Sequence, residues 1–225
     1  MSEPTTKERL LDAAEILFAQ KGYEAVSIRE IAGAADVNLA AVNYHFQGKE
    51  NLYREVLRRF LAPKREKLLA AIALVEAADD SQPRLEMLIR AFVGTHLEDA
   101  LNSPRGLLGL HLMSREMAEP RQGARVLVEE LIGPVRRRFL LLLRELLPAM
   151  SDVRLQMIIG SIVGQFVYYA MHWHNQRNMP GTAQETPLAF VSLGDGIEEY
   201  ISNVIEHVTR FTLGGIREIS EGGDT

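Results

Sequence analysis

The sequence predicts an all-α protein of about nine helices. Apolar residues recur at spacings of three and four along most of the chain, which is the period of an amphipathic helix. Many of these stripes follow a residue that can cap a helix and end at a Gly or Pro that can stop one. No segment alternates apolar and polar residues over the length of a β-strand. The 225 residues, 47% of them hydrophobic, suffice for one large globular domain or two small ones.

Composition and charge narrow the class of protein. The chain has no cysteine, which excludes a disulfide framework and a thiolate metal site. No N-terminal stretch has the charged-then-apolar form of a signal peptide, so we expect a cytoplasmic protein. The net charge is −5, and acidic residues outnumber basic ones in the first fifty positions. Any affinity for DNA must therefore come from a few placed cations, helix N-termini and a second copy of the chain.

The first helix is predicted from Thr5 or Thr6 to about Lys21, with Gly22 as its stop. Two short helices joined by a tight turn should then occupy residues 27–46. Ser27 and Glu30 have the spacing of a capping box at the start of the first of these helices.

Asn38 can cap the second short helix, which we expect from Leu39 to about Tyr44. Its exposed side carries the small or medium side chains of residues 39–41, and it ends in the polar residues 43–45. These properties suit insertion into the major groove of DNA.

A long helix should begin around Lys49 and continue to about residue 75, with Pro63 inside it or at a bend. Lys49 lies in the first turn, where a cation is unfavourable to the helix dipole, and a bound phosphate would remove that penalty. The acidic run 76–82 predicts a loop. The long helix thus connects the predicted DNA reader to the rest of the chain.

The middle of the chain predicts three more helices. The first begins with Pro83 in its first turn and ends near Asn102, and a shorter one covers about 105–117. After a loop over 119–123, a long helix should cover 126–147, with Pro134 as a kink. The arginine run 136–138 is expected to be a solvated face, with DNA contact as the lesser alternative.

The last two long helices close the chain. Residues 152–174, capped by Ser151, are apolar nearly all round, which favours burial in the core and in a dimer seam over a membrane span. A polar connection (175–184) and an ambiguous stretch (186–193) follow. A capping box of Asp195 and Glu198 should start the final helix, which we expect to close at Gly214-Gly215, with a mobile tail from 218.

Residues 7–53 resemble the DNA-binding domain of TetR/AcrR-type repressors. This resemblance implies a ligand-responsive transcriptional repressor. It also implies a helix-turn-helix domain over residues 1–50 and a helical effector-binding and dimerisation domain over 51–225. The matching positions are Phe18, Gly22, Tyr23, Ser27, Ile31, Ala32, Val37, Tyr44, His45, Phe46, Lys49, Leu52 and Tyr53.

A second resemblance covers the C-terminal part. LMSREM (112–117) with the following EPRQG, VLVEELIGPVRRRF (126–139) and HVTRFTLGGIRE (207–218) is similar to CecR-like regulators within the TetR class. It implies a homodimer through the last two long helices and a small-molecule pocket in each subunit. Pockets vary within the family, so the effector does not carry over.

Candidate DNA contacts combine the resemblance with side-chain chemistry. Arg29 can pair with guanine, and Asn43 can read adenine or phosphate. The alternatives are that Ser27 is only a cap, that Tyr44 is a core residue and that His45 makes a local structural bond. Phe46 is expected in the core. The full set is Ser27, Arg29, Asn38, Leu39, Ala40, Asn43, Tyr44, His45 and Lys49.

Candidate effector contacts come from the larger domain. Arg115 and Glu116 stand among apolar residues, which predicts a buried pair or a pocket wall, with a salt bridge that fastens two helices as the alternative. His172 and His174 are two residues apart on a helix and point to different faces, so we expect no metal, and no cofactor is expected. The full set is His111, Met113, Arg115, Glu116, Phe166, Tyr169 and His172.

The expected mechanism has two states. A dimer places two recognition helices about one DNA turn apart, ~34–36 Å, on a palindromic operator. A small-molecule effector favours a spacing that no longer fits. The expected partners are thus an operator, an effector and a second copy, without a membrane or an enzymatic activity. The alternatives are a small helical enzyme or binding protein that uses the C-terminal pocket, and a helical scaffold with a vestigial reader.

Overall fold

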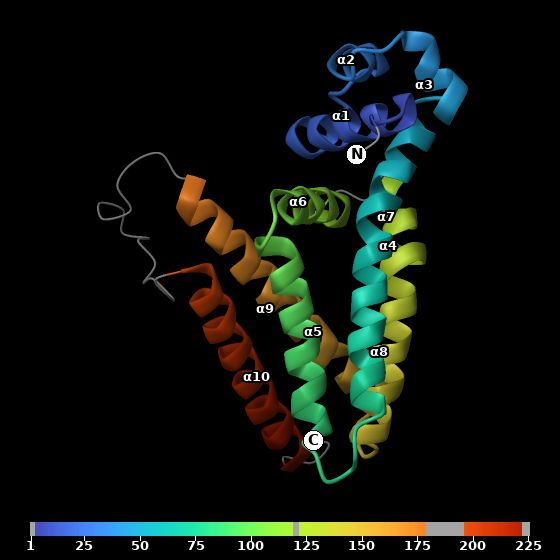
Figure 1. Cartoon of the computed structure of the whole chain (residues 1–225). Helices are drawn as coiled ribbons and strands as arrows, with labels where there is room; N and C mark the ends of the chain where they lie inside the picture. Colours follow the sequence, from blue (N-terminus) through green and yellow to red (C-terminus); the bar gives the residue numbers. More distant parts are fainter. Residues whose placement is uncertain (1–2, 119–121, 179–195, 222–225) are drawn as a thin grey trace. The chain divides into compact units, whose positions relative to one another are not determined.

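The computed structural model describes residues 3–118, 122–178 and 196–221 (Figure 1). None of the described residues forms a strand, which confirms the all-α prediction. With α7, η1 and α8 counted as one continuous helix, the described residues form nine helices. Their bounds are α1 Thr6–Lys21, α2 Ile28–Ala34, α3 Leu39–Phe46, α4 Lys49–Glu76, α5 Arg84–Leu101, α6 Pro104–Ala118, α7 Gln122–Leu127, the π-helix η1 Val128–Ile132, α8 Gly133–Leu146, α9 Asp152–Asn178 and α10 Ile197–Glu221.

The chain divides into two compact units. The first contains residues 1–66 and 103–135, and the second contains residues 67–102 and 136–225. The helices α4 and α8 each belong partly to both units. These units are defined by packing. The functional division at residue 50 stays a prediction.

In the first unit, α1 packs on α2, α3 and α6. Thr5 starts α1 with a complete capping box, because its side chain accepts from the Glu8 amide and Glu8 reaches back to the Thr5 amide. Gly22 ends the helix with φ +81°, a conformation that glycine adopts without steric cost. The ring of Phe18, fully buried on α1, lies 4.8 Å from the ring of Tyr53 on α4. Local signals therefore fix the ends of α1, and the ring contact packs it against the start of α4.

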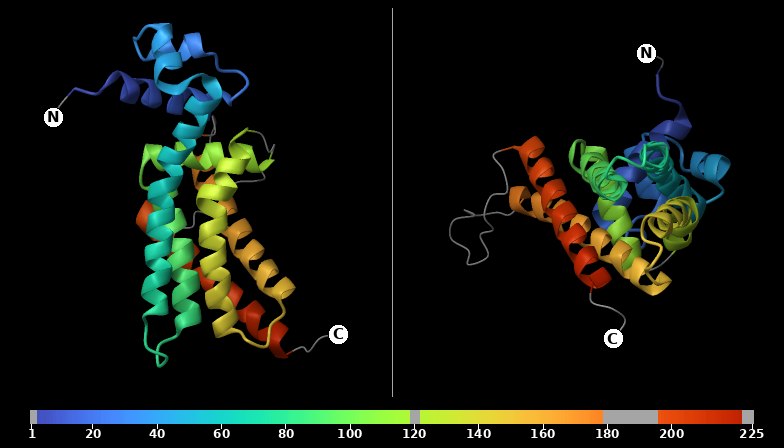
Figure 2. Two further views of the ribbon diagram at one scale, coloured as in Figure 1. Left: turned by 90° about the vertical axis from the view of Figure 1, so that its right-hand side faces the viewer. Right: turned by 90° about the horizontal axis from the view of Figure 1, so that it is seen from below.

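In the second unit, α5 packs on α9 and α10, and α9 packs on α10 (Figure 2). An aromatic cluster joins α5 to α8 and α9, with ring centroids 4.2 Å apart for His96 and Phe166 and 4.5 Å apart for Phe92 and Phe139. The helix α9 buries one side of its surface and leaves Met157 and Tyr168 exposed on another. No helix in the described part of the chain is long and apolar enough to cross a membrane.

The long helix widens into a π-turn just before Pro134, and the kink expected there stays a prediction. Proline has no N–H to donate to the carbonyl of Glu130, four residues earlier. The backbone widens there, and the Gly133 amide donates to the carbonyl of Val128. Arg65 on α4 donates to the carbonyl of Glu130 at 3.2 Å. The long helix predicted from 126 thus begins at residue 122 and contains a wider turn.

The predicted closure of the last helix at Gly214-Gly215 is wrong, because α10 continues through both residues to Glu221. Glycine stops a helix when it takes a positive φ, and neither residue does so. Buried Ile216 and a hydrogen bond from Arg154 to the Ile219 carbonyl, 3.3 Å long, support the last turns.

Two smaller predictions also change. Ser27 caps α2, but the Glu30 side chain bonds Lys21 and so does not complete the capping box. Pro83 occupies the N-cap position, one residue before α5 begins. The loop predicted over 119–123 and the connection predicted over 175–184 are helical where they are described, because α7 includes residues 122–123 and α9 continues to Asn178. Residues 119–121, residues 179–193 and the cap at Asp195 lie outside the described residues.

Candidate nucleic-acid interface

The turn between α2 and α3 is held by hydrogen bonds from α1 and by the cap at the start of α3. Asp36 has a φ of +52°, a left-handed conformation that Asp tolerates better than most residues. The guanidinium of Arg9 on α1 donates to the Asp36 carbonyl at 2.8 Å and to its carboxylate at 3.3 Å. Asn38 then caps α3, because its side chain accepts from the Ala40 amide at 2.8 Å. The first unit therefore contains a well-defined helix-turn-helix.

One face of α3 is buried and the other is open. Val42 and Phe46 are 0% and 3% exposed and hold the helix on the first unit. Tyr44 is 83% exposed, which excludes its alternative assignment to the core. The other predicted contact residues on the open side of this region are Asn38, Leu39, Ala40 and Asn43, all exposed.

Three predicted residues flank this open face. The Ser27 hydroxyl accepts from the Glu30 amide at 3.1 Å, so its role as a cap is established. Arg29 is exposed and makes no ion pair with any residue that the structure describes. His45 is half-buried, and its ring lies 4.9 Å from that of Tyr44.

Lys49 is held at the start of α4. Its ammonium lies 4.3 Å above the ring centroid of Tyr23 and 3.4 Å from the carbonyl of Glu24. A cation over an aromatic ring is attracted by the ring quadrupole. The Tyr23 ring thus offsets some of the unfavourable helix dipole and keeps the ammonium at the helix N-terminus.

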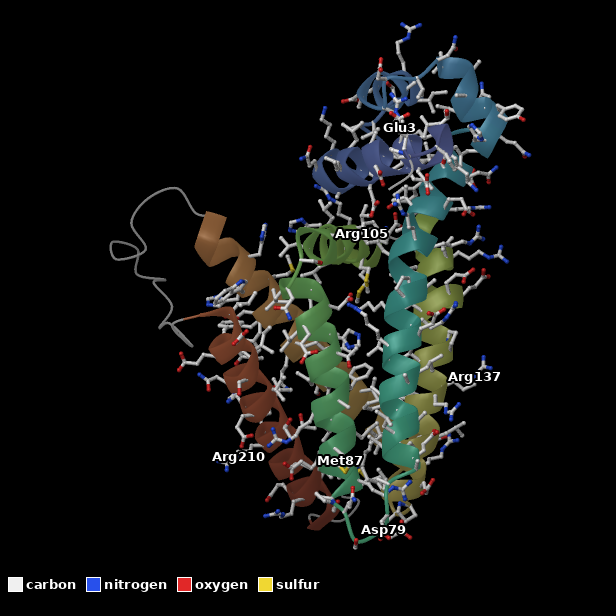
Figure 3. The ribbon with its side chains drawn as sticks, viewed as in Figure 1. Glu3, Asp79, Met87, Arg105, Arg137 and Arg210 are labelled. Atoms are coloured by element: carbon white, nitrogen blue, oxygen red, sulfur yellow. The ribbon has the colours of Figure 1, made fainter. Side chains whose placement is uncertain are left out.

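Most cations near the reader already have carboxylate partners. Arg9 pairs with Asp36, Lys21 with Glu30, Arg54 with Glu50, and Arg59 with Asp12 and Glu15. Arg105 on α6, labelled in Figure 3, also bonds Glu15, at 2.8 Å. These pairs limit the positive field that the first unit presents to a polyanion.

The predicted effector residues on α6 do not form a buried pair. Glu116 is 4% exposed and accepts a hydrogen bond of 2.6 Å from the hydroxyl of Tyr53 on α4. Arg115 is exposed and donates to the carbonyl of Gln20 on α1 at 3.3 Å. His111 and Met113 are half-buried on the same helix. No role for Tyr53 in this site follows from the sequence, because nothing in the local pattern relates Tyr53 to a residue 63 positions later.

The remaining predicted effector residues lie on α9 in the second unit. Phe166 and His172 are 7% and 8% exposed, and burial lowers the pKa of the His172 imidazole. The carbonyl of Tyr169 accepts from the Tyr200 hydroxyl at 2.7 Å. His96, which is not among the predicted effector residues, is buried in the same unit beside Phe166. Its spacing of four from Phe92 indicates that the two side chains lie on one face of α5. The seven candidates are therefore divided between the units, and a single pocket that contains them stays a prediction.

The helices α9 and α10 enclose a mainly apolar groove of about 430 Å³. Exposed Met157 and Phe211 line it, together with Ile158 and Ile216. Within the described ranges, no three His, Asp or Glu side chains gather in a way that would hold a metal ion.

Comparisons with known proteins cover most of the chain. A family model described as "Bacterial regulatory proteins, tetR family" matches residues 10–56, and one described as "Tetracyclin repressor-like, C-terminal domain" matches 90–192. These matches leave the CecR-like resemblance as a prediction.

Two curated relatives align with part of the chain. A probable HTH-type transcriptional regulator, YttP, of Bacillus subtilis is 32% identical over 37% of this chain and 41% of its own length. An HTH-type transcriptional repressor, KstR2, of Rhodococcus jostii is 36% identical over 37% of this chain and 39% of its own length. The aligned part thus spans about two fifths of each relative. Both relatives are named as regulators of transcription.

A solved structure supports the fold over nearly the whole chain. The fatty acid degradation regulator FadR from Bacillus halodurans has a TM-score of 0.57 and 17% identity, and the match covers 96% of this chain and 99% of that one. At this identity the likeness shows the fold alone.

Proposed function

The chain belongs to the TetR family of bacterial transcriptional regulators, and we propose that it is a cytoplasmic repressor that a small-molecule effector releases from its operator. Two copies would bind a palindromic site, with one α3 in each of two successive major grooves about 34 Å apart. The observation that carries the proposal is the open face of α3, where Tyr44 is 83% exposed while Val42 and Phe46 hold the helix from behind.

The proposed contacts divide by chemistry. Arg29 and Asn43 are the base-reading candidates, because guanidinium and carboxamide groups match the edges of guanine and adenine. Ser27, Tyr44, His45 and Lys49 would bond phosphates and fix the register of the helix. Asn38, Leu39 and Ala40 form the slim leading end of α3 that enters the groove.

The second copy would dock on α9 and α10. Three features of these helices support an interface: exposed Met157 and Phe211, the apolar groove that they line, and glycines at 160, 164, 214 and 215, where a Cβ atom would have no heavy atom within 4 Å. Open space beside a helix at glycine lets a partner helix approach closely. We propose that these two helices from each subunit form a four-helix interface.

The effector would bind within the helical region beyond residue 50. The predicted contacts are His111, Met113, Arg115 and Glu116 on α6 and Phe166, Tyr169 and His172 on α9. Burial of Phe166 and His172 supports an apolar ligand with a polar group, the usual content of such pockets.

The test begins with the operator. Genomic DNA fragments that the purified protein retains would be sequenced, with and without candidate effectors. Gel shifts at matched salt would then compare the wild type with Tyr44→Ala, Lys49→Ala and the control Leu74→Ala, whose side chain is 74% exposed on α4. Each reader variant should bind about tenfold more weakly. Lys49→Ala removes one phosphate contact per subunit, so it should lower the salt slope of the dimer by about 1.8.

Unchanged affinity in both reader variants would overturn the assigned surface. Retention of no fragment by a dimeric protein would instead support the scaffold with a vestigial reader.

A further inference from the structure

The first unit contains a small polar cavity whose lining includes Arg115 and Glu116 from the proposed effector contacts but none of the effector residues on α9. It has a volume of about 260 Å³ and lies among the loop that follows α1, the first part of α4 and the end of α6. Tyr23, Tyr53, Arg115 and Glu116 line it. Typical pockets for drug-sized ligands measure about 300–1,000 Å³, so this one suits a smaller molecule.

The Glu116 carboxylate in the lining is held in one position. Glu116 is 4% exposed, Tyr53 is 2% exposed, and the phenol donates to the carboxylate at 2.6 Å. Gly123 permits this placement, because a Cβ there would come within 2.7 Å of the Glu116 carboxyl carbon. A buried carboxylate that is held in one position is an effective partner for an ammonium group, since little water competes for it.

Arg115 supplies cationic hydrogen-bond donors to the lining of the same cavity. The Arg115 guanidinium gives one hydrogen bond to the Gln20 carbonyl at 3.3 Å, and arginine carries five N–H groups in all. Gly22 makes room for it, because the guanidinium nitrogen lies 3.1 Å from the Cβ position of that residue. The Tyr23 hydroxyl stays protonated, since burial and the nearby Glu50 and Glu24 raise its pKa.

We propose that this cavity binds a small zwitterion of the amino-acid type. Its carboxylate would pair with Arg115 and the Tyr23 hydroxyl, and its ammonium group would pair with Glu116. An acidic and a basic group on adjacent residues of α6 select a ligand that carries both charges. A simple anion would meet the Glu116 carboxylate, and a simple cation would meet Arg115.

The cavity shares Arg115 and Glu116 with the proposed effector contacts, but binding here requires neither the operator nor the effector residues on α9. The contacts of Arg115 and Glu116 also join α6 to α1 and α4, so binding here would stabilise the unit that contains the reader helix. A purely structural role for the same contacts predicts no ligand. A direct measurement of binding therefore distinguishes a ligand site from a purely structural role.

The experiment is isothermal titration of the full chain without DNA. The twenty proteinogenic L-amino acids would be titrated singly, together with acetate as an anion alone and ethylammonium as a cation alone. We expect at least one amino acid to bind, and acetate and ethylammonium to bind at least about tenfold more weakly. No binding of any amino acid, or equal binding of acetate, would overturn the proposal and leave the repressor function untouched.

Variants then assign the binding to this cavity. Arg115→Gln should weaken binding of the amino acid by about tenfold or more, and Tyr23→Phe should weaken that binding by a smaller factor. Met117→Ala, 52% exposed on the same helix and not part of the lining, is the control. Circular dichroism would confirm that each variant folds. Wild-type affinity in both Arg115→Gln and Tyr23→Phe would place the ligand elsewhere and refute the assignment.

Discussion

The guanidinium of Arg9 bonds the backbone carbonyl of Asp36 at 2.8 Å, and Asp36 is the residue that turns the chain from α2 into α3. A side chain of the first helix thus holds the left-handed residue on which the placement of the recognition helix depends. The two residues are 27 positions apart in the sequence. The turn is therefore a product of the whole three-helix arrangement.

Arg9→Met should loosen this turn. We expect the free energy of unfolding to fall by about 0.5–1 kcal/mol, all from the carbonyl bond, since the Asp36 carboxylate is fully exposed. Urea denaturation followed by circular dichroism would measure it. Arg29→Met, at an exposed arginine of the same unit, should leave stability unchanged, and an equal loss in both variants would contradict the assigned role.

Gly123→Ala should destabilise the first unit. The new Cβ would lie 2.5 Å from a methyl carbon of Leu57 and 2.7 Å from the carboxyl carbon of Glu116, both buried. Overpacking of this kind costs about 1–3 kcal/mol, and a gain of about 1 kcal/mol in helix propensity offsets part of it, so we expect a net loss of up to about 2 kcal/mol.

Gly33→Ala is the matched control, because nothing lies within 4 Å of its Cβ position on α2. It should stabilise the protein by about 0.5–1 kcal/mol in the same urea titrations. Equal effects of the two substitutions would show that the space around Gly123 does not decide its identity.

The protein should lose stability in alkali. Burial raises the pKa of the Tyr53 phenol, and the Glu116 carboxylate raises it further, while burial also raises the pKa of Tyr200. Above about pH 10 the unfolded chain loses these protons and the folded chain keeps them. The unfolded state then binds fewer protons, so the free energy of unfolding falls as pH rises, by up to about 1.4 kcal/mol per unit for each tyrosine.

Urea midpoints from about pH 8 to 11 would test this dependence. Tyr200→Phe should flatten the alkaline slope, and Tyr44→Phe, at an exposed phenol, should not. A slope that is the same in all three proteins would refute the assignment to buried phenols.

Phe211→Asp should weaken self-association. Phe211 is 64% exposed beside the α9–α10 groove, and a buried unpaired charge at an interface costs on the order of 2 kcal/mol or more. Sedimentation velocity over a concentration series would report the change. Leu74→Asp, at a side chain 74% exposed on α4, should sediment as the wild type does. If Phe211→Asp leaves the dimer unaffected, the interface does not include this groove.

Local chemistry made much of this fold predictable from sequence. Thr5, Ser27 and Asn38 cap their helices as expected, because a cap needs only its own residue and the next turn. The open face of α3 follows from the same spacing rules. Residue spacing alone does not identify which short helix would read DNA, and the family resemblance indicates that it is α3.

Features that depend on distant partners were not predictable. The π-turn before Pro134 needs Arg65 from another helix to satisfy the carbonyl of Glu130. The Tyr53–Glu116 bond also joins two separate helices, and a sequence pattern says nothing of which buried groups meet. Gly214 and Gly215 stay helical because neighbouring residues support the last turns, which a local rule for glycine cannot register.

The paired cations around the reader bear on how quickly the protein would find its site. Arg9, Lys21, Arg54 and Arg59 already neutralise carboxylates of their own chain, so few of them are available to displace counterions from arbitrary DNA. One-dimensional sliding depends on that nonspecific attraction. Repeated dissociation and re-encounter through solution would then dominate the search, and the association rate would vary little with the length of the flanking DNA.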